Sequence, residues 1–139
     1  MTTTAPSRLS ALFAPGEQLL RLSLRLDAVV TGANGIAYLA LAYPLERLLG
    51  LDVTAAMAIG AFLTAYGLAV AAVGLRSPVS RPAAAAVAIG NAGWVVASIA
   101  AVLTGALNLT TAGTAWAILQ ACTVGAFAAL QYLGLRRAN

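Results

Sequence analysis

The sequence has no histidine and no lysine, and it has one cysteine and four acidic residues among 139 positions. The absence of histidine excludes most zinc, copper and haem sites, because imidazole is a ligand in most of them. With one cysteine, Cys122, the chain forms no intramolecular disulfide and has no cysteine pair for redox chemistry. A lone cysteine in an apolar segment is more often a small packing residue than a nucleophile. We therefore expect no metal and no cofactor.

Charge is the second shortage. Only 9% of the residues are charged and 61% are hydrophobic, whereas about a quarter of the residues in a soluble domain are charged. So few charges do not cover a water-exposed surface, and apolar segments that cross ~30 Å of hydrocarbon are the expected alternative. Three segments are free of charge: residues 28–45, 53–75 and 82–135.

The third segment is too long for one crossing at ~1.5 Å per residue, so it must turn back. The turn is predicted at "TGALNLTT", residues 104–111, where polar residues and a glycine interrupt the apolar run. The sequence therefore predicts an all-α membrane protein, a bundle of four transmembrane helices at about residues 27–45, 53–75, 83–103 and 111–134. They form one domain, residues 17–137, after a tail at residues 1–16 that we expect to be flexible.

The basic residues predict the orientation of these helices. All eight are arginine, and only Arg47 falls in a loop on the side opposite to the termini. Under the positive-inside rule, this bias places both termini in the cytoplasm and the protein in the plasma membrane as a multi-pass protein. Basic residues in such a protein report orientation, so the net charge of +4 does not predict a nucleic-acid partner.

The segment before the first crossing, "EQLLRLSLRL" at residues 17–26, has two interpretations. In the first it is a helix that lies at the membrane interface, with Arg21 and Arg25 facing lipid phosphates. In the second it is a simple helical lead-in whose arginines reach the interface. In both, Glu17 and Arg21 are four residues apart in the favourable order for an ion pair.

Small residues recur at steps of three and four on two of the predicted helices. Such residues let helix backbones approach closely in lipid, so both stripes predict helix–helix packing. The first stripe is Gly60, Thr64, Gly67, Ala71 and Gly74, and the second is Ala86, Gly90, Gly93, Ala97 and Ala100. Paired glycines at residues 32/35 and 90/93, with "VGLR" at 73–76 and "LGLR" at 133–136, also suggest two tandem helix-hairpin repeats.

Polar and aromatic residues form one stripe on each of three predicted helices, and we expect these stripes to face the bundle interior. The stripes are Asp27, Thr31, Asn34 and Tyr38 on the first helix, Asn91, Trp94 and Ser98 on the third, and Trp116, Gln120, Thr123, Phe127 and Gln131 on the fourth. By depth, Asn34, Asn91 and Tyr66 lie at one level, and Tyr38, Trp94 and Gln120 lie near mid-membrane. A Trp at mid-membrane needs a partner for its indole N–H, and Gln120 is the best candidate by depth. One interpretation is that the asparagine amides bond across close helix contacts and only hold the bundle together. The other is a ligand-binding cavity open toward the cytoplasm, lined by Asn34, Tyr38, Tyr66, Asn91, Trp94 and Gln120.

Asp27 is the one carboxylate near a predicted helix interior. We expect it at the cytoplasmic boundary, in a surface ion pair with a nearby arginine. The functional alternative is a carboxylate that binds a proton or a cation at the mouth of a pathway.

The segments "LRLDAVVTGANGIAYLA", "GTAWAILQ" and "LQYLGLRR" resemble a family of short four-helix integral membrane proteins from actinobacteria. The resemblance covers residues 19–137 and implies the four-helix architecture, but it implies no activity and no site residues. A broader similarity to small DoxX-like membrane proteins rests on size and helix number.

Three functions compete. The first is a non-catalytic membrane module that binds membrane lipids, another amphipathic small molecule or a partner protein. The second is a small oligomeric transporter or channel that uses the polar face of Asp27, Asn34, Asn91 and Gln120. The third, an enzyme, is disfavoured because Glu46 and Asp52 are expected on the opposite side of the membrane from Asp27, so no two carboxylates share a site.

Overall fold

The computed structural model describes residues 16–138 of the chain, which form five helices and no strand. The predicted flexible tail lies outside the described residues apart from Gly16. The helices are α2 (Glu17–Ala40), α3 (Ala42–Leu49), α4 (Val53–Gly74), α5 (Arg81–Thr104) and α6 (Thr111–Ala138). The limits predicted for the last three crossings agree with α4, α5 and α6 to within a few residues, and the predicted turn lies between α5 and α6.

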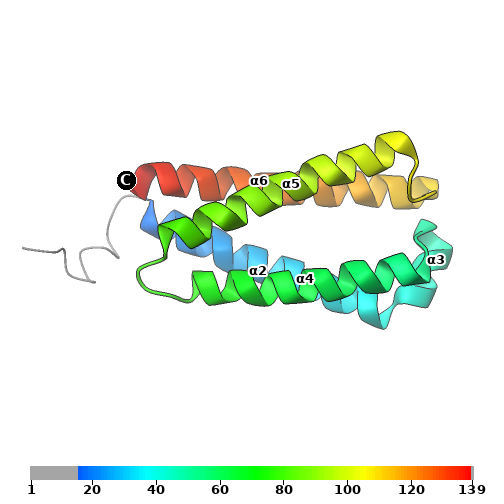
Figure 1. The fold of residues 1–139 in the computed structure, drawn as a ribbon, viewed down its shortest axis with the longest axis horizontal. Coiled ribbons are helices and arrows are strands. Elements are labelled where there is room, and N and C mark those ends of the chain that lie inside the picture. Colours follow the sequence, from blue (N-terminus) through cyan, green and yellow to red (C-terminus); the bar gives the residue numbers. More distant parts are fainter. Residues whose placement is uncertain (1–15, 139) are drawn as a thin grey trace, which may run out of the picture.

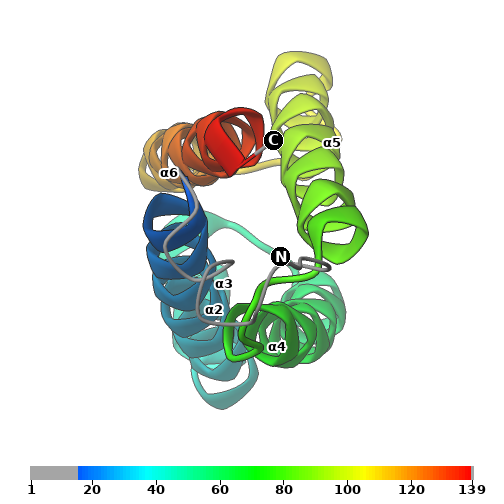
Figure 2. The same ribbon diagram turned by 90° about the vertical axis from the view of Figure 1, so that its left-hand side faces the viewer.

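The long helices form two hairpins that lie side by side (Figure 1). α2 packs along α4, α5 packs along α6, and α2 also contacts α6. α4 and α5 touch the least of the neighbouring long helices, and Figure 2 shows α5 inclined away from α4. The start of α2 and the end of α6 lie at one end of the bundle, which we call the terminal end, and α3 lies at the other (Figure 1).

Three helices in the described part of the chain are long and apolar enough to cross a membrane: α4, α5 and α6. α2 and α3 pass the same test only as a pair, and they are bent by 94° relative to each other. The protein is therefore all-helical with three or four candidate membrane spans.

The first helix differs from the prediction at both of its ends. It begins at Glu17 rather than near residue 27, so the segment 17–26 is a lead-in continuous with α2 rather than a separate interfacial helix. It ends at Ala40 because Pro44 has no N–H to donate to the Ala40 carbonyl. Pro44 instead lies in the first turn of α3, where a missing N–H costs little. The connection between the first two predicted crossings is therefore helical as far as Leu49.

Glycines bring α2 and α4 into backbone contact. A Cβ atom at Gly67 would lie 2.8 Å from the backbone N of Gly32, and one at Gly60 would lie 2.8 Å from the carbonyl oxygen of Gly35. The packing predicted for the first small-residue stripe is confirmed.

The second stripe, on α5, packs less closely than the first. Its five residues are all exposed, and a Cβ atom at Gly93 would meet nothing within 4 Å, but one at Gly90 would lie 2.6 Å from the hydroxyl oxygen of Tyr66 on α4. The predicted packing is therefore confirmed at Gly90 and not at Gly93. In the other glycine pair, Gly35 likewise meets α4 and a Cβ atom at Gly32 would meet nothing within 4 Å, and the tandem repeat stays a prediction.

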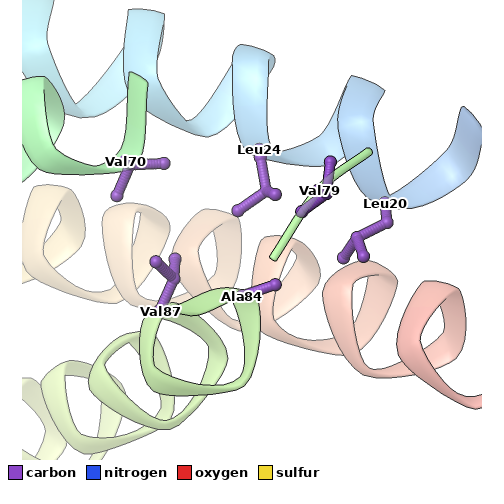
Figure 3. Close-up of a cluster of buried hydrophobic side chains, with 6 residues drawn as sticks. All are labelled: Leu20, Leu24, Val70, Val79, Ala84 and Val87. Carbon is purple, nitrogen blue, oxygen red and sulfur yellow. The ribbon is translucent and has the colours of Figure 1, made fainter. Parts of the chain in front are cut away.

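The terminal end is closed by an apolar cluster from α2, α4, α5 and the α4–α5 loop (Figure 3). Its buried members are Leu20, Leu24, Val70, Val79, Ala84 and Val87. Two charged residues of α2, Glu17 and Arg25, make hydrogen bonds to the α4–α5 loop and to the end of α4 beside this cluster. The Glu17 carboxylate accepts from the Val79 N–H at 3.1 Å and pairs with Arg21 at 3.1 Å, which confirms the predicted pair. Arg25 donates to the carbonyl of Gly74 at 3.0 Å, at the end of α4.

Candidate functional site

Four polar side chains from α2, α5 and α6 form a buried cluster next to the apolar core. The Asp27 carboxylate accepts three hydrogen bonds: from Thr31 Oγ1 at 2.7 Å, from Asn91 Nδ2 at 2.7 Å and from Gln131 Nε2 at 2.8 Å. Asn91 Nδ2 also donates to Gln131 Oε1 at 3.0 Å. All four residues are buried, and the exposed fraction of Asp27 is 0%. The cluster joins three helices through one carboxylate.

The predicted surface ion pair of Asp27 is wrong. Because α2 begins at Glu17, Asp27 lies about 15 Å along the helix from its start, at ~1.5 Å per residue. Within residues 16–138 its hydrogen bonds come from neutral side chains, and the ion pair of that part of the chain joins Arg21 to Glu17. A carboxylate is costly to bury among apolar residues unless it is hydrogen-bonded, so its position marks it as a functional candidate.

A cavity of about 420 Å³ lies between the two hairpins and receives side chains from all four long helices. Its lining is mostly apolar, and no charged residue contributes to it. Thr31 and Asn91 belong both to the lining and to the polar cluster. Five of the six predicted cavity residues line it: Asn34, Tyr66, Asn91, Trp94 and Gln120.

Tyr38 lies outside this cavity and lines two smaller ones toward the α3 end, of about 140 and 250 Å³. Its hydroxyl accepts a hydrogen bond from Trp116 Nε1 at 2.8 Å. Trp116 lines all three cavities, so the Tyr38–Trp116 pair lies at the boundary between the large cavity and the two smaller ones.

The predicted partnership of Trp94 and Gln120 is confirmed. Trp94 Nε1 donates to Gln120 Oε1 at 2.8 Å, and Gln120 Nε2 in turn donates to Ser98 Oγ at 3.0 Å. The ring of Trp94 also stacks on Phe62 of α4, with centroids 5.8 Å apart and planes 11° apart. Phe62 continues the aromatic wall to Tyr66 at 5.7 Å. The hydroxyl of Tyr66 donates to the carbonyl of Val87 at 2.9 Å, which links α4 to α5.

The two asparagines differ in what they do. Asn91 bonds across helices as predicted, but the Asn34 amide makes no hydrogen bond within the described part of the chain. The expectation that Asn34 holds helices together is therefore wrong. Asn34 is half-buried and lines two cavities, so its amide is available to a ligand.

The cavity is closed toward the terminal end, the side on which the sequence predicts its opening to the cytoplasm. Along α2 the apolar core (Leu20, Leu24) comes first, then Asp27, and then the cavity residues, so core and cluster close the terminal end. Lining residues on all four long helices are exposed, including Val30 on α2, Phe62 on α4, which is 51% exposed, and Gly93 on α5. The lining therefore reaches the surface of the bundle, which would be accessible to lipid if these helices span a membrane.

Two contributors were not assigned to the site from the sequence. Gln131 continues the polar stripe of α6, which indicated an interior position but not its bond to Asp27. Phe62 was not singled out, although its spacing of four from Tyr66 puts both on one helix face. All the other stripe residues are buried or half-buried, so the predicted interior orientation of the polar stripes is confirmed.

The side chains that line the cavity carry amide, hydroxyl and aromatic groups. Among the described residues, no group of three His, Cys, Asp or Glu side chains is placed to hold a metal ion. Amide and hydroxyl groups alternate with aromatic rings around an apolar space, an arrangement typical of small-molecule pockets. Comparison with known proteins finds no matching family model, no matching curated protein and no matching solved structure.

Proposed function

We propose that this chain is a non-catalytic membrane protein that binds an amphipathic molecule in the cavity between its two hairpins. In this proposal α2 with α3 forms a fourth membrane-inserted unit, both termini are cytoplasmic, and the protein resides in the plasma membrane. The molecule enters from the lipid phase. Membrane lipids are thus both the surroundings of the protein and a source of ligands.

The observation that carries the proposal is the lining of the 420 Å³ cavity. Pockets of 300–1,000 Å³ with a largely apolar wall and a few polar groups are the usual sites of small molecules. Here the polar groups are the unpaired amide of Asn34 and those of Asn91 and Gln120, all beside aromatic rings. The apolar part of a ligand thus contacts the apolar lining, and its polar group contacts the amides and the aromatic rings beside them.

The transporter or channel alternative is supported less well. A solute path along Asp27, Asn34, Asn91 and Gln120 would have to continue to the terminal end, where Leu20, Leu24 and Val87 are buried against one another. An oligomer does not remove this block, because the apolar cluster lies within one chain.

The binding proposal can be tested with the protein's own tryptophans. The chain has two, Trp94 and Trp116, and both line the cavity. In nanodiscs, a bromododecyl alcohol at low mole fraction should quench their fluorescence saturably, because bromine quenches on contact. Quenching that only rises in proportion to probe content would contradict the proposal.

A matched pair of variants locates the effect. Gly93→Leu places a side chain into open cavity space, whereas Ala92→Leu adds the same side chain at an exposed neighbour that does not line the cavity. Filling the cavity should weaken probe binding about tenfold or more. Ala92→Leu should bind as the unmodified protein does. Equal binding in both variants would place the probe elsewhere.

A further inference from the structure

The cavity has an acidic group behind its lining and no basic residue in it. No basic residue lines the cavity, and the closest side-chain layer behind it holds the carboxylate of Asp27. Thr31 and Asn91 each donate to that carboxylate and also face the cavity, so a single layer of side chains separates the two. Because the surroundings are apolar, this charge acts over a longer range than it would in water.

The aromatic wall adds to the same preference. Phe62, Tyr66 and Trp94 form a continuous row of rings in which neighbouring centroids are 5.7 and 5.8 Å apart, and Trp116 and Phe127 line the cavity as well. Ring faces attract cations, and tryptophan attracts them most strongly. A phosphate or carboxylate in the cavity would meet no cationic partner and would lie close to Asp27.

We infer that the amphipathic ligand carries a positively charged ammonium group and no phosphate. This inference rests on the proposed function and specifies its ligand class. The ammonium group lies between the aromatic rings and the wall formed by Thr31 and Asn91, and the oxygen of the unpaired Asn34 amide attracts it as a dipole. Asp27 provides the compensating charge without contact.

The test compares four bromododecyl probes that differ only in the head group: trimethylammonium, alcohol, sulfate and phosphocholine. Tryptophan quenching in nanodiscs of zwitterionic lipid reports the affinity of each. We expect the trimethylammonium probe to bind about tenfold tighter than the alcohol, the scale of a desolvated cation–aromatic contact, and the sulfate to bind weakest. Equal affinity for trimethylammonium and alcohol would overturn the inference but leave the proposed function intact. Absence of saturable quenching by every probe would overturn both.

The phosphocholine probe distinguishes a simple cation from a zwitterionic lipid head group. It should bind more weakly than trimethylammonium, because its phosphate has no basic partner among the lining residues. Phosphocholine binding as tight as that of trimethylammonium would overturn the assignment of a phosphate-free cation.

Variants of the carboxylate identify the source of the preference. Asp27→Asn should reduce the preference for trimethylammonium over the alcohol severalfold and leave the part that the aromatic rings supply. Binding of the alcohol probe to the same variant reports whether the cavity is intact. The double variant Asp27→Asn/Asn91→Asp moves the carboxylate to a partner that itself lines the cavity, and it should restore the preference. If the preference is undiminished in Asp27→Asn, the carboxylate does not contribute to it, and the role inferred for Asp27 is wrong.

Discussion

Asn91 Nδ2 lies 2.7 Å from Asp27 Oδ2 and ties α5 to α2, two helices from different hairpins. The same amide nitrogen also bonds Gln131 on α6, so the contact joins three helices at one point. It separates the apolar core of the terminal end from the cavity. The relationship explains why a carboxylate is kept inside the bundle: it accepts from donors on three helices.

The first prediction concerns the stability supplied by this cluster. Asp27→Leu removes the acceptor and leaves three donors buried, those of Thr31, Asn91 and Gln131. A buried polar group without a partner costs ~1–3 kcal/mol. Single hydrogen bonds measured inside membrane proteins contribute less, ~0.6–2 kcal/mol. We therefore expect the free energy of unfolding to fall by about 2–4 kcal/mol. Unfolding by SDS in mixed micelles measures it. Asp27→Asn should cost less, because the partner amides can turn to offer oxygens. An Asp27→Leu protein as stable as the unmodified one would show that the cluster does not hold the helices together.

The second prediction contrasts two glycines. Gly67→Ala puts a Cβ atom 2.8 Å from the backbone N of Gly32 and should destabilise the protein by about 1–3 kcal/mol through overpacking. Gly93→Ala meets open space and should stabilise it slightly, by up to ~1 kcal/mol, because alanine favours a helix over glycine. The same SDS titration checks both. Equal effects of the two substitutions would contradict the asymmetry between the hairpins.

The third prediction separates binding from folding at Asn34. Since its amide makes no hydrogen bond within residues 16–138, Asn34→Leu should leave the free energy of unfolding unchanged to within about 0.5 kcal/mol, as expected of a site without structural partners. Binding of the trimethylammonium probe should weaken severalfold. A large loss of stability in this variant would mean that Asn34 has a structural role.

The fourth prediction concerns the pair formed by Trp94 and Gln120. A double-mutant cycle with Trp94→Phe and Gln120→Leu should give a coupling free energy of ~0.6–1.7 kcal/mol, the range for hydrogen bonds inside membrane proteins. Additive effects, with no coupling, would indicate that the 2.8 Å contact contributes nothing to stability.

The fifth prediction tests orientation. With six arginines of the described chain at the terminal end and Arg47 in α3 at the other, a green fluorescent protein fused after the last residue should fluoresce in the cytoplasm. Alkaline phosphatase inserted between α3 and α4, after Asp52, should be active only outside it. The opposite pair of results would reverse the proposed topology.

Much of the fold follows from local pattern, whereas the site depends on contacts that pattern does not encode. The segments without charged residues predict α4, α5 and α6. The expected depth of Trp94 and Gln120 in the membrane predicts the hydrogen bond between them. The burial of Asp27 was missed because Glu17, Arg21 and Arg25 suggested a later helix start. Those charges are accommodated by contacts with distant residues, such as Arg25 with the Gly74 carbonyl. In the same way, the exposure of Gly93 depends on how α5 inclines from α4.

The most direct test of a ligand-binding cavity is native mass spectrometry of the protein released from gently solubilised cell membranes. We predict a discrete additional mass on the unmodified protein and on Ala92→Leu, of a positively charged amphipathic compound, and its loss in Gly93→Leu. A ligand-free protein in all three samples, or the same bound mass in all three, would contradict the account.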